Sequence, residues 1–278
     1  MPFPVFPPGE DPGPSFSELL RRTGAVPPPP DGVVRGVSHG TTVAALRYGD
    51  GVVMAGDRRA ISGNLISYRT MEKVFPADRH SGVAIAGAAG PATDMVKLFQ
   101  LQLEHYEKVE GAELSLDGKA NQLAAMVRSH LPAALQGLAV VPLFAGYDFR
   151  LRAGRLFQYD VTGGRYEEGD FASAGSGSLH AATVIKMGHR PDLDRGGALD
   201  LAISALFQAA DEDAATGGPD LVRGIFPTMA TITEAGFDRV DEPEVSERFR
   251  RLLDHLSAAR STASTGAVPT IPRAGEEG

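Results

Sequence analysis

Two short runs of β-branched and small apolar residues constrain the fold of this chain more than any other feature. They are TTVAALRY (41–48) and GVVMAGD (51–57), and they flank Gly49-Asp50-Gly51. Valine and threonine favour extended strands, and aspartate followed by glycine supplies the positive backbone φ angles of a tight turn. We therefore expect a β-hairpin over residues 41–57, with its first strand at the start of a folded domain.

The segments before and after this domain differ from it in composition. Half of the 20 prolines lie within residues 1–40, which predicts an extended segment with room for only one short helix, SFSELLRR (15–22). Residues 257–278 are small and polar and contain proline and glycine, as is typical of a disordered tail. The folded domain is thus expected to span residues 41–256.

The composition excludes several classes of partner and site. The net charge is −8 and no cluster of lysine or arginine offsets it, so we expect neither a nucleic-acid surface nor a membrane surface. The most apolar later stretch, residues 131–147, is too short to span a membrane. The chain contains no cysteine, which excludes disulfides and a thiol nucleophile. No basic region precedes an apolar one at the N-terminus, so we expect no secretory signal and a cytoplasmic location.

The remaining pattern predicts helices and strands that are segregated along the chain. Apolar residues at helical spacing indicate helices, and short β-branched runs indicate strands. Strands and helices follow one another without regular βαβ alternation, which favours an α+β fold over a doubly wound parallel sheet. Pro132 is expected to kink or shorten one helix. The helices are predicted around 96–106, 123–135, 199–206 and 245–256, and the further strands at 65–69, 82–87, 142–148, 155–160, 165–174 and 225–233.

Two candidate nucleophiles lie close together near residue 40. Gly-Val-Ser-His-Gly (36–40) matches the serine-hydrolase G-x-S-x-G motif, which requires a strand before the serine and a helix after it, and Ser38 has neither. Thr41 is an ordinary strand residue unless cleavage after Gly40 places it at a free N-terminus. There its own α-amine, with an ordinary pKa of about 7.7–8.0, would be the base that a hydroxyl nucleophile needs. We therefore favour Thr41, with residues 1–40 as an inactivating propeptide.

Several separated motifs resemble those of the proteasome β subunits of actinobacteria. The resemblance covers residues 41 to about 232 and implies the N-terminal nucleophile hydrolase fold. That fold is a four-layer α/β/β/α sandwich, in which two antiparallel sheets lie between helix layers. The motifs are TTVAALRYGDGVVMAGDRRA (41–60) with the following Lys73, QLEHYEK (102–108), LFAGYD (143–148), GSGS (175–178) and DEDAATGGPDLVRGIFPT (211–228).

The resemblance implies a first group of catalytic residues around Thr41, the nucleophile. Lys73 would assist proton transfer and stabilise the alkoxide-like transition state, and Asp57 would orient Lys73. The backbone N–H of Gly87 would help hold the oxyanion, a contribution of ~3 kcal/mol for such a donor. Without the resemblance, Lys73 reads as a surface residue, Asp57 as a turn former and Gly87 as a packing glycine.

A second group of catalytic residues is implied near the threonine amine. It comprises Ser176, Asp213 and Thr216, and Thr216 stands where many relatives have serine. From the residues alone, Asp213 and Thr216 read as the end of a helix before two glycines. Ala214 departs from the pattern, because serine is common there, and the change puts one hydrogen bond of this cluster in doubt.

The same resemblance places an apolar specificity pocket beside the threonine, lined by Ala60, Met71, Ile85 and Ala89. Such a wall favours cleavage after hydrophobic residues, since a buried apolar surface penalises an unpaired charge. Ile61 stands where the substrate-binding strand often has threonine, and its backbone would still pair with an extended substrate. Ordinary core packing is the alternative for each of the four wall residues.

The implied function is that of a threonine endopeptidase that cleaves itself between Gly40 and Thr41 and then hydrolyses unfolded proteins. The implied partners are proteasome α subunits, other β subunits in seven-membered rings and, indirectly, an ATPase unfoldase ring. The histidines show no metal-ligand spacing, so neither a metal nor another cofactor is expected. Two alternatives stay open: a subunit of the bacterial two-component threonine protease, which generally lacks a long propeptide, and a non-catalytic ring subunit.

Overall fold

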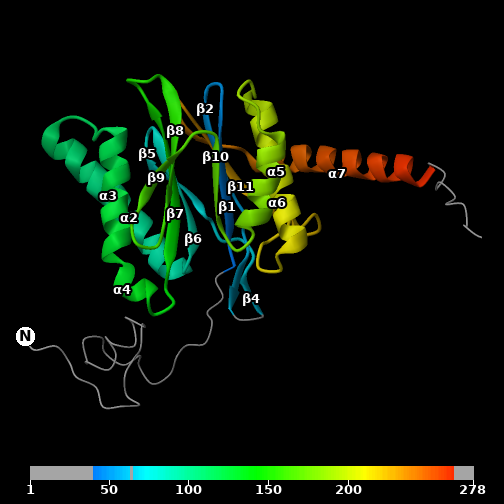
Figure 1. The fold of residues 1–278 in the computed structure, drawn as a ribbon, viewed down its shortest axis with the longest axis horizontal. Helices are drawn as coiled ribbons and strands as arrows, with labels where there is room; N and C mark the ends of the chain where they lie inside the picture. The colour runs from blue at the N-terminus through cyan, green and yellow to red at the C-terminus, as the bar shows by residue number, and fades with distance from the viewer. Residues whose placement is uncertain (1–39, 63–64, 266–278) are drawn as a thin grey trace, which may run out of the picture. The chain divides into compact units, whose positions relative to one another are not determined.

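The computed structural model describes residues 40–62 and 65–265, with side chains described up to Ala258 (Figure 1). Of the predicted propeptide, only Gly40 falls within these residues. The candidate Ser38 and the helix predicted over 15–22 lie outside them.

The first sheet contains the predicted hairpin and is antiparallel throughout, in the order β10-β1-β2-β11-β12. Tyr48 pairs with Gly51 across the turn, so the predicted hairpin is confirmed. β1 also pairs with β10, which comes from a distant part of the sequence, and Thr42 stands opposite Gly175 there. The strands are β1 (Thr42–Tyr48), β2 (Gly51–Gly56), β10 (Phe171–Gly175), β11 (Thr228–Thr233) and β12 (Gly236–Arg239).

A second antiparallel sheet has the order β5-β6-β7-β8-β9, and a separate two-stranded ribbon is formed by β3 and β4. The ribbon directly follows β2, so it carries the chain from the first sheet to the second. The strands are β3 (Ala60–Ser62), β4 (Leu65–Tyr68), β5 (Val74–Asp78), β6 (Ser81–Gly87), β7 (Val140–Asp148), β8 (Ala153–Tyr159) and β9 (Arg165–Glu168).

Helices cover the outer faces of both sheets, with one helix layer on each side (Figure 1). One apolar cluster, including Phe99 and Phe144, lies between α2, α3 and the second sheet, and another, including Leu46 and Leu206, lies between α5, α6 and the first. A third, including Met54, fills the space between the sheets. The predicted four-layer α+β sandwich is confirmed. The helices are α2 (Ala89–Glu110), α3 (Leu116–Ser129), α4 (Leu131–Ala134), α5 (Ser178–Gly188), α6 (Arg195–Glu212) and α7 (Glu242–Thr265).

Three expectations about individual elements can be compared with the structure. The strand predicted over 165–174 is wrong: it is two strands, β9 and β10, which belong to different sheets because the chain turns at Gly169 and Asp170. Pro132 shortens the helix as predicted, since α3 ends at Ser129 and α4 begins at Leu131. The disordered tail predicted from residue 257 is wrong for its first part, because α7 continues to Thr265, and the rest of it lies outside the described residues.

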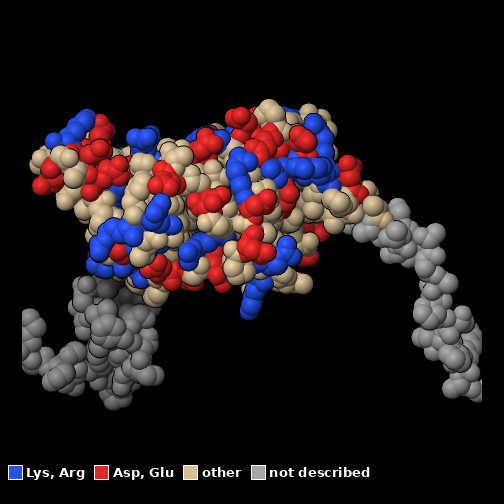
Figure 2. Space-filling model, turned by 90° about the horizontal axis from the view of Figure 1, so that it is seen from above, with Lys and Arg blue, Asp and Glu red and all other residues tan. Residues whose placement is uncertain are grey.

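The exposed face in Figure 2 carries acidic and basic side chains interspersed with one another, without a continuous basic area. Among the helices that the structure describes, none is both long enough and apolar enough to cross a membrane.

Candidate active site

Thr41 directly precedes β1 and contacts the loop that follows β10. It is 5% exposed. Its carbonyl oxygen accepts a hydrogen bond of 2.9 Å from the backbone N–H of Ser176. The preceding Gly40 is also buried, and a Cβ added to it would lie 2.2 Å from the Cβ of Ala215. The Gly40–Thr41 bond is therefore held in a closely packed setting in which only glycine fits before the threonine.

Asp57 directly follows β2, and the hairpin returns it to the beginning of β1. Its Oδ1 accepts hydrogen bonds from the Lys73 ammonium and from the backbone N–H of Thr42, both at 2.7 Å. Its Oδ2 accepts from the backbone N–H groups of Arg59, at 2.9 Å, and Gly217, at 2.8 Å. The side chains of Asp57 and Lys73 are completely buried. Four donors thus fix this carboxylate beside the residue that follows Thr41.

Lys73 lies one residue before β5, so the second sheet contributes the cation of the buried pair. Its Nζ also donates to the carbonyl oxygen of Arg59, at 2.6 Å. Burial lowers the pKa of Lys73, and although Asp57 acts in the opposite direction, the pKa stays below its ordinary value. A lysine of lowered pKa releases and accepts a proton more readily near neutral pH, as a proton-transfer group requires.

Asp213 follows the last residue of α6 and is the centre of the second predicted cluster. Its Oδ2 accepts hydrogen bonds from the hydroxyls of Ser176 and Thr216, and its Oδ1 accepts from the backbone N–H of Ala215, at 3.1 Å. Burial acts to raise the pKa of Asp213, but these three hydrogen bonds outweigh it and the pKa is lowered. The structure therefore brings Ser176, Asp213 and Thr216 together around an ionised carboxylate.

The second cluster reaches Thr41 through Ser176, whose Oγ lies 3.4 Å from the Thr41 carbonyl oxygen. Ala214 takes part through its backbone alone, because its carbonyl oxygen accepts a hydrogen bond of 2.9 Å from the Arg59 guanidinium. Arg59 thereby connects the segment after Asp57 with the segment after Asp213.

Sequence reasoning missed Thr42, which contacts both groups. Its backbone N–H donates to Asp57, and its hydroxyl lies 2.6 Å from that of Thr216. The only signal in the sequence is the Thr-Thr pair itself, and threonine is so common in strands that the second member attracts no notice. Complete burial of its hydroxyl is the feature that distinguishes it.

Gly87 ends β6 in a backbone conformation that requires glycine. Its φ is +107°, and a Cβ there would lie 2.1 Å from the carbonyl oxygen of Ala139. These constraints explain the glycine through backbone geometry alone. Its role as an oxyanion donor stays a prediction.

The residues predicted to line the specificity pocket differ in exposure. Ala60 and Ile61 lie on β3 and are partly exposed, as are Met71 and Ala89. Ile85 is only 2% exposed and belongs to the core between the second sheet and its helices, where Met71 packs against the same cluster. The alternative of core packing therefore describes Ile85 in this structure, and its role in the pocket stays a prediction.

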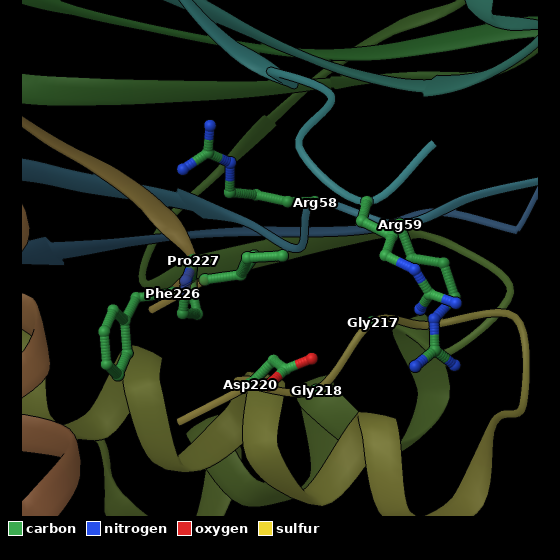
Figure 3. A pocket seen from close by; sticks show the side chains of 9 residues that line it. Arg58, Arg59, Gly217, Gly218, Asp220, Phe226 and Pro227 are labelled. Atoms are coloured by element: carbon green, nitrogen blue, oxygen red, sulfur yellow. The ribbon is translucent and has the colours of Figure 1, made fainter. Parts of the chain in front are cut away.

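A separate hollow is lined in part by Arg58 and Arg59, which directly follow Asp57 in the sequence (Figure 3). In that view Arg58 and Arg59 lie on one side of it, and Gly218 and Asp220 lie on the other. None of the five predicted pocket residues lines it, so it is not the predicted substrate pocket. Its lining residues are Arg58, Arg59, Arg69, Gly217, Gly218, Asp220, Ile225, Phe226 and Pro227.

Comparison with known proteins places this arrangement in a family. Residues 37–225 match the proteasome subunit family, a range that contains every residue of both clusters. The chain belongs to the proteasome subunit family. The match agrees with the antiparallel sheets enclosed by helices. Proteasomes are proteases, so the geometry of the site can be considered as that of a protease family.

Individual relatives in this family are similar over most of their length. A protein of Acidimicrobium ferrooxidans named proteasome subunit beta is 59% identical over 247 residues, which are 88% of this chain and 90% of that protein. One of Streptomyces griseus with the same name is 57% identical, over 82% of this chain and 80% of the relative. One of Jonesia denitrificans is 56% identical, over 75% of this chain and 69% of the relative.

Proposed function

We propose that this chain is a catalytic β subunit of a proteasome core and acts as a threonine endopeptidase. Thr41 is the nucleophile, and it becomes active when the bond after Gly40 is cleaved. The observation that carries the proposal is the buried Asp57–Lys73 pair, which is hydrogen-bonded to the residue that directly follows Thr41. A non-catalytic ring subunit of this fold would have no use for an ion pair whose burial is costly.

Self-cleavage is the first step of the proposed mechanism. The Thr41 hydroxyl attacks the carbonyl carbon of Gly40, which carries no side chain to hinder it. The Gly40–Thr41 amide bond breaks as an ester to the Thr41 oxygen forms, and water then hydrolyses the ester and releases residues 1–40. Until that bond breaks, the Thr41 nitrogen is an amide and cannot accept a proton. Afterwards it is a primary amine and can act as a general base close to the hydroxyl. Residues 1–40 would thus keep the subunit inactive before processing.

Peptide hydrolysis then uses the two clusters in different ways. Lys73 assists proton transfer at the Thr41 hydroxyl, because its lowered pKa brings it closer to working pH. Asp213 stays ionised and holds Ser176 against the Thr41 backbone, beside the position that the new amine takes. The N–H of Gly87 would donate to the oxyanion that forms on the substrate.

Substrate selection would depend on the apolar residues next to the site, Ala60, Met71, Ile85 and Ala89. A wall of this composition favours hydrophobic side chains before the cleaved bond. Assembly would follow what the resemblance to proteasome β subunits implies, with other β subunits in seven-membered rings, α subunits at their ends and an ATPase ring that feeds unfolded protein in the cytoplasm. The two-component threonine protease fits less well, since it generally lacks a long propeptide.

The test is the mature N-terminus together with peptide hydrolysis. Mass spectrometry of the assembled protein should find Thr41 as the first residue, and fluorogenic peptides with a hydrophobic residue before the cleaved bond should be hydrolysed. Thr41→Ala should retain residues 1–40 and hydrolyse nothing, whereas Ser38→Ala should behave as the unaltered protein. Retention of residues 1–40 in an inactive assembly, or activity in Thr41→Ala, would overturn the proposal.

A further inference from the structure

The hydroxyl of Thr42 is part of a continuous hydrogen-bonded chain between the beginning of β1 and Asp213. Thr42 and Thr216 are both fully buried, and their Oγ atoms lie 2.6 Å apart. The backbone N–H of Gly177 donates to Thr42 Oγ at 3.0 Å. The Thr216 hydroxyl donates to Asp213 Oδ2 at 2.7 Å. These contacts link three segments that are far apart in the sequence.

The direction of every bond in this chain follows from counting hydrogens. A hydroxyl has one hydrogen, and that of Thr216 is used toward Asp213, whose ionised carboxylate can only accept. The hydrogen between the two threonines must therefore belong to Thr42. Because Gly177 donates to Thr42, the chain runs from the Gly177 N–H through the Thr42 and Thr216 hydroxyls to Asp213. Hydrogen bonds arranged head to tail in this way polarise and strengthen one another.

The backbone of Thr42 is fixed as firmly as its hydroxyl. Its N–H donates to Asp57 Oδ1, and its carbonyl oxygen accepts from the Asp57 N–H at 3.0 Å. Thr42 is thus held by the Asp57–Lys73 pair through its backbone and by the Asp213 cluster through its side chain. A residue placed in this way sets the position of one cluster relative to the other.

We propose that Thr42 is a positioning residue, whose hydroxyl orients the Asp213 cluster toward Thr41. The inference rests on the proposed function, because it assigns Thr42 to the same reaction. Gly177 adjoins Ser176, the member of the cluster that contacts the Thr41 carbonyl. A Cβ on Gly177 would lie 2.5 Å from Thr42 Oγ and 2.7 Å from Thr216 Oγ, so the close approach itself requires glycine.

Loss of this hydroxyl affects the reaction and leaves substrate binding unchanged. Thr42→Val keeps the shape of the side chain, but the Gly177 N–H then has no acceptor, and the loop that carries Ser176 loses one of the hydrogen bonds that hold it. Thr42 is completely buried, so the variant alters no surface that a substrate touches. We expect kcat to fall on the order of tenfold, as for loss of a buried hydrogen-bond partner near a reacting group, with KM unchanged.

The experiment compares Thr42→Val with Thr42→Ser, which keeps the hydroxyl and loses only the methyl group. Thr42→Ser should retain most of kcat and most of the rate of self-cleavage, whereas Thr42→Val should lower both. Equal kcat in Thr42→Val and the unaltered protein, or equal losses in both variants, would overturn the inference. The double variant Thr42→Val/Thr216→Val should lose less kcat than the product of the two single losses, because each single variant already removes the Thr42–Thr216 hydrogen bond. Fully multiplied losses would show that the two threonines act independently and would overturn the inference.

A second readout does not depend on activity. Hydrogen–deuterium exchange in the uncleavable Thr41→Ala protein should become faster at the Gly177 amide in Thr42→Val and stay slow in Thr42→Ser. If Thr42→Val left the exchange rate of the Gly177 amide unchanged, the inference would be overturned, even if the protein with Thr41 intact hydrolysed peptides. Absence of hydrolysis by the protein with Thr41 intact would instead count against the proposed function, and the exchange result would still decide the role of Thr42.

Discussion

Asp57 accepts hydrogen bonds at one carboxylate oxygen from the Lys73 ammonium and the backbone N–H of Thr42, each at 2.7 Å. A single atom thus joins the charged group that directly precedes the second sheet to the strand that begins beside Thr41. The two sheets have to be packed together for this contact to exist. The geometry around Thr41 is therefore a property of the whole sandwich, and several substitutions can probe it.

Lys73→Met should abolish most peptide hydrolysis while the protein still folds. It removes the proposed proton-transfer group, a loss on the order of 100-fold or more in kcat. It also leaves Asp57 buried without its cation, although three backbone N–H donors remain, so we expect a stability loss of about 3 kcal/mol. Hydrolysis rates and thermal unfolding measure the two effects. Lys108→Met removes an exposed lysine paired with Glu104 and serves as the control, because such pairs contribute little.

Gly40→Val should slow self-cleavage and cause the unprocessed chain to accumulate. Any Cβ at this position meets the Cβ of Ala215 at 2.2 Å, so the Gly40–Thr41 bond has to move. Gel analysis of processing over time measures the effect. Gly40→Val/Ala215→Gly removes one of the clashing atoms and should recover part of the rate. Processing of Gly40→Val at the normal rate would contradict the packing argument.

Gly87→Ala should destabilise the fold more than Gly111→Ala does. Both glycines have positive φ, +107° and +71°, so both substitutions introduce backbone strain of about 1 kcal/mol or more. Only Gly87 also has a backbone atom in the way, the Ala139 carbonyl oxygen at 2.1 Å, whereas nothing lies within 4 Å of a Cβ on Gly111. Thermal unfolding of the two variants separates strain from collision. Equal losses would show that the collision relaxes without cost.

The contribution of Asp213 to stability should disappear in acid. Its pKa in the folded chain is lowered from the ordinary 3.8, so its stabilising effect is complete above that value and is lost as pH falls toward the folded pKa. The difference in unfolding temperature between the unaltered protein and Asp213→Asn should therefore be constant above about pH 5 and shrink below about pH 4. A difference that grows with acidity would contradict the lowered pKa.

The hairpin and the long helices were predictable because their signals are local, whereas the four-layer sandwich was implied by the family resemblance. Gly49-Asp50-Gly51 determines a turn from three adjacent residues, and the helical period of 3.6 residues needs no knowledge of distant segments. The division of residues 165–174 between two sheets was not predictable in the same way. Both halves look like strand, and their partners, Tyr159 and Leu46, are determined by packing across the whole domain.

The candidate site divides along similar lines. Thr41, Asp57 and Lys73 follow from a resemblance in sequence, and the structure brings Asp57 and Lys73 into contact. Ile85 was assigned to the pocket by the same resemblance, but core side chains cover it. Its burial was not predictable, because the sequence alone does not say which face of a strand a neighbouring helix covers. Thr42 was overlooked because its importance comes from Gly177 and Thr216, which lie more than a hundred residues away.

The Gly40–Thr41 bond is buried within the site itself, and this determines which subunits can become active. Under the proposed function, the first peptide bond that each subunit cuts is its own, and it does so with the groups that later cut substrates. A chain in which any of these groups is misplaced cannot cleave off its own residues 1–40. Every subunit that becomes active has therefore already carried out one cleavage with correctly placed catalytic groups.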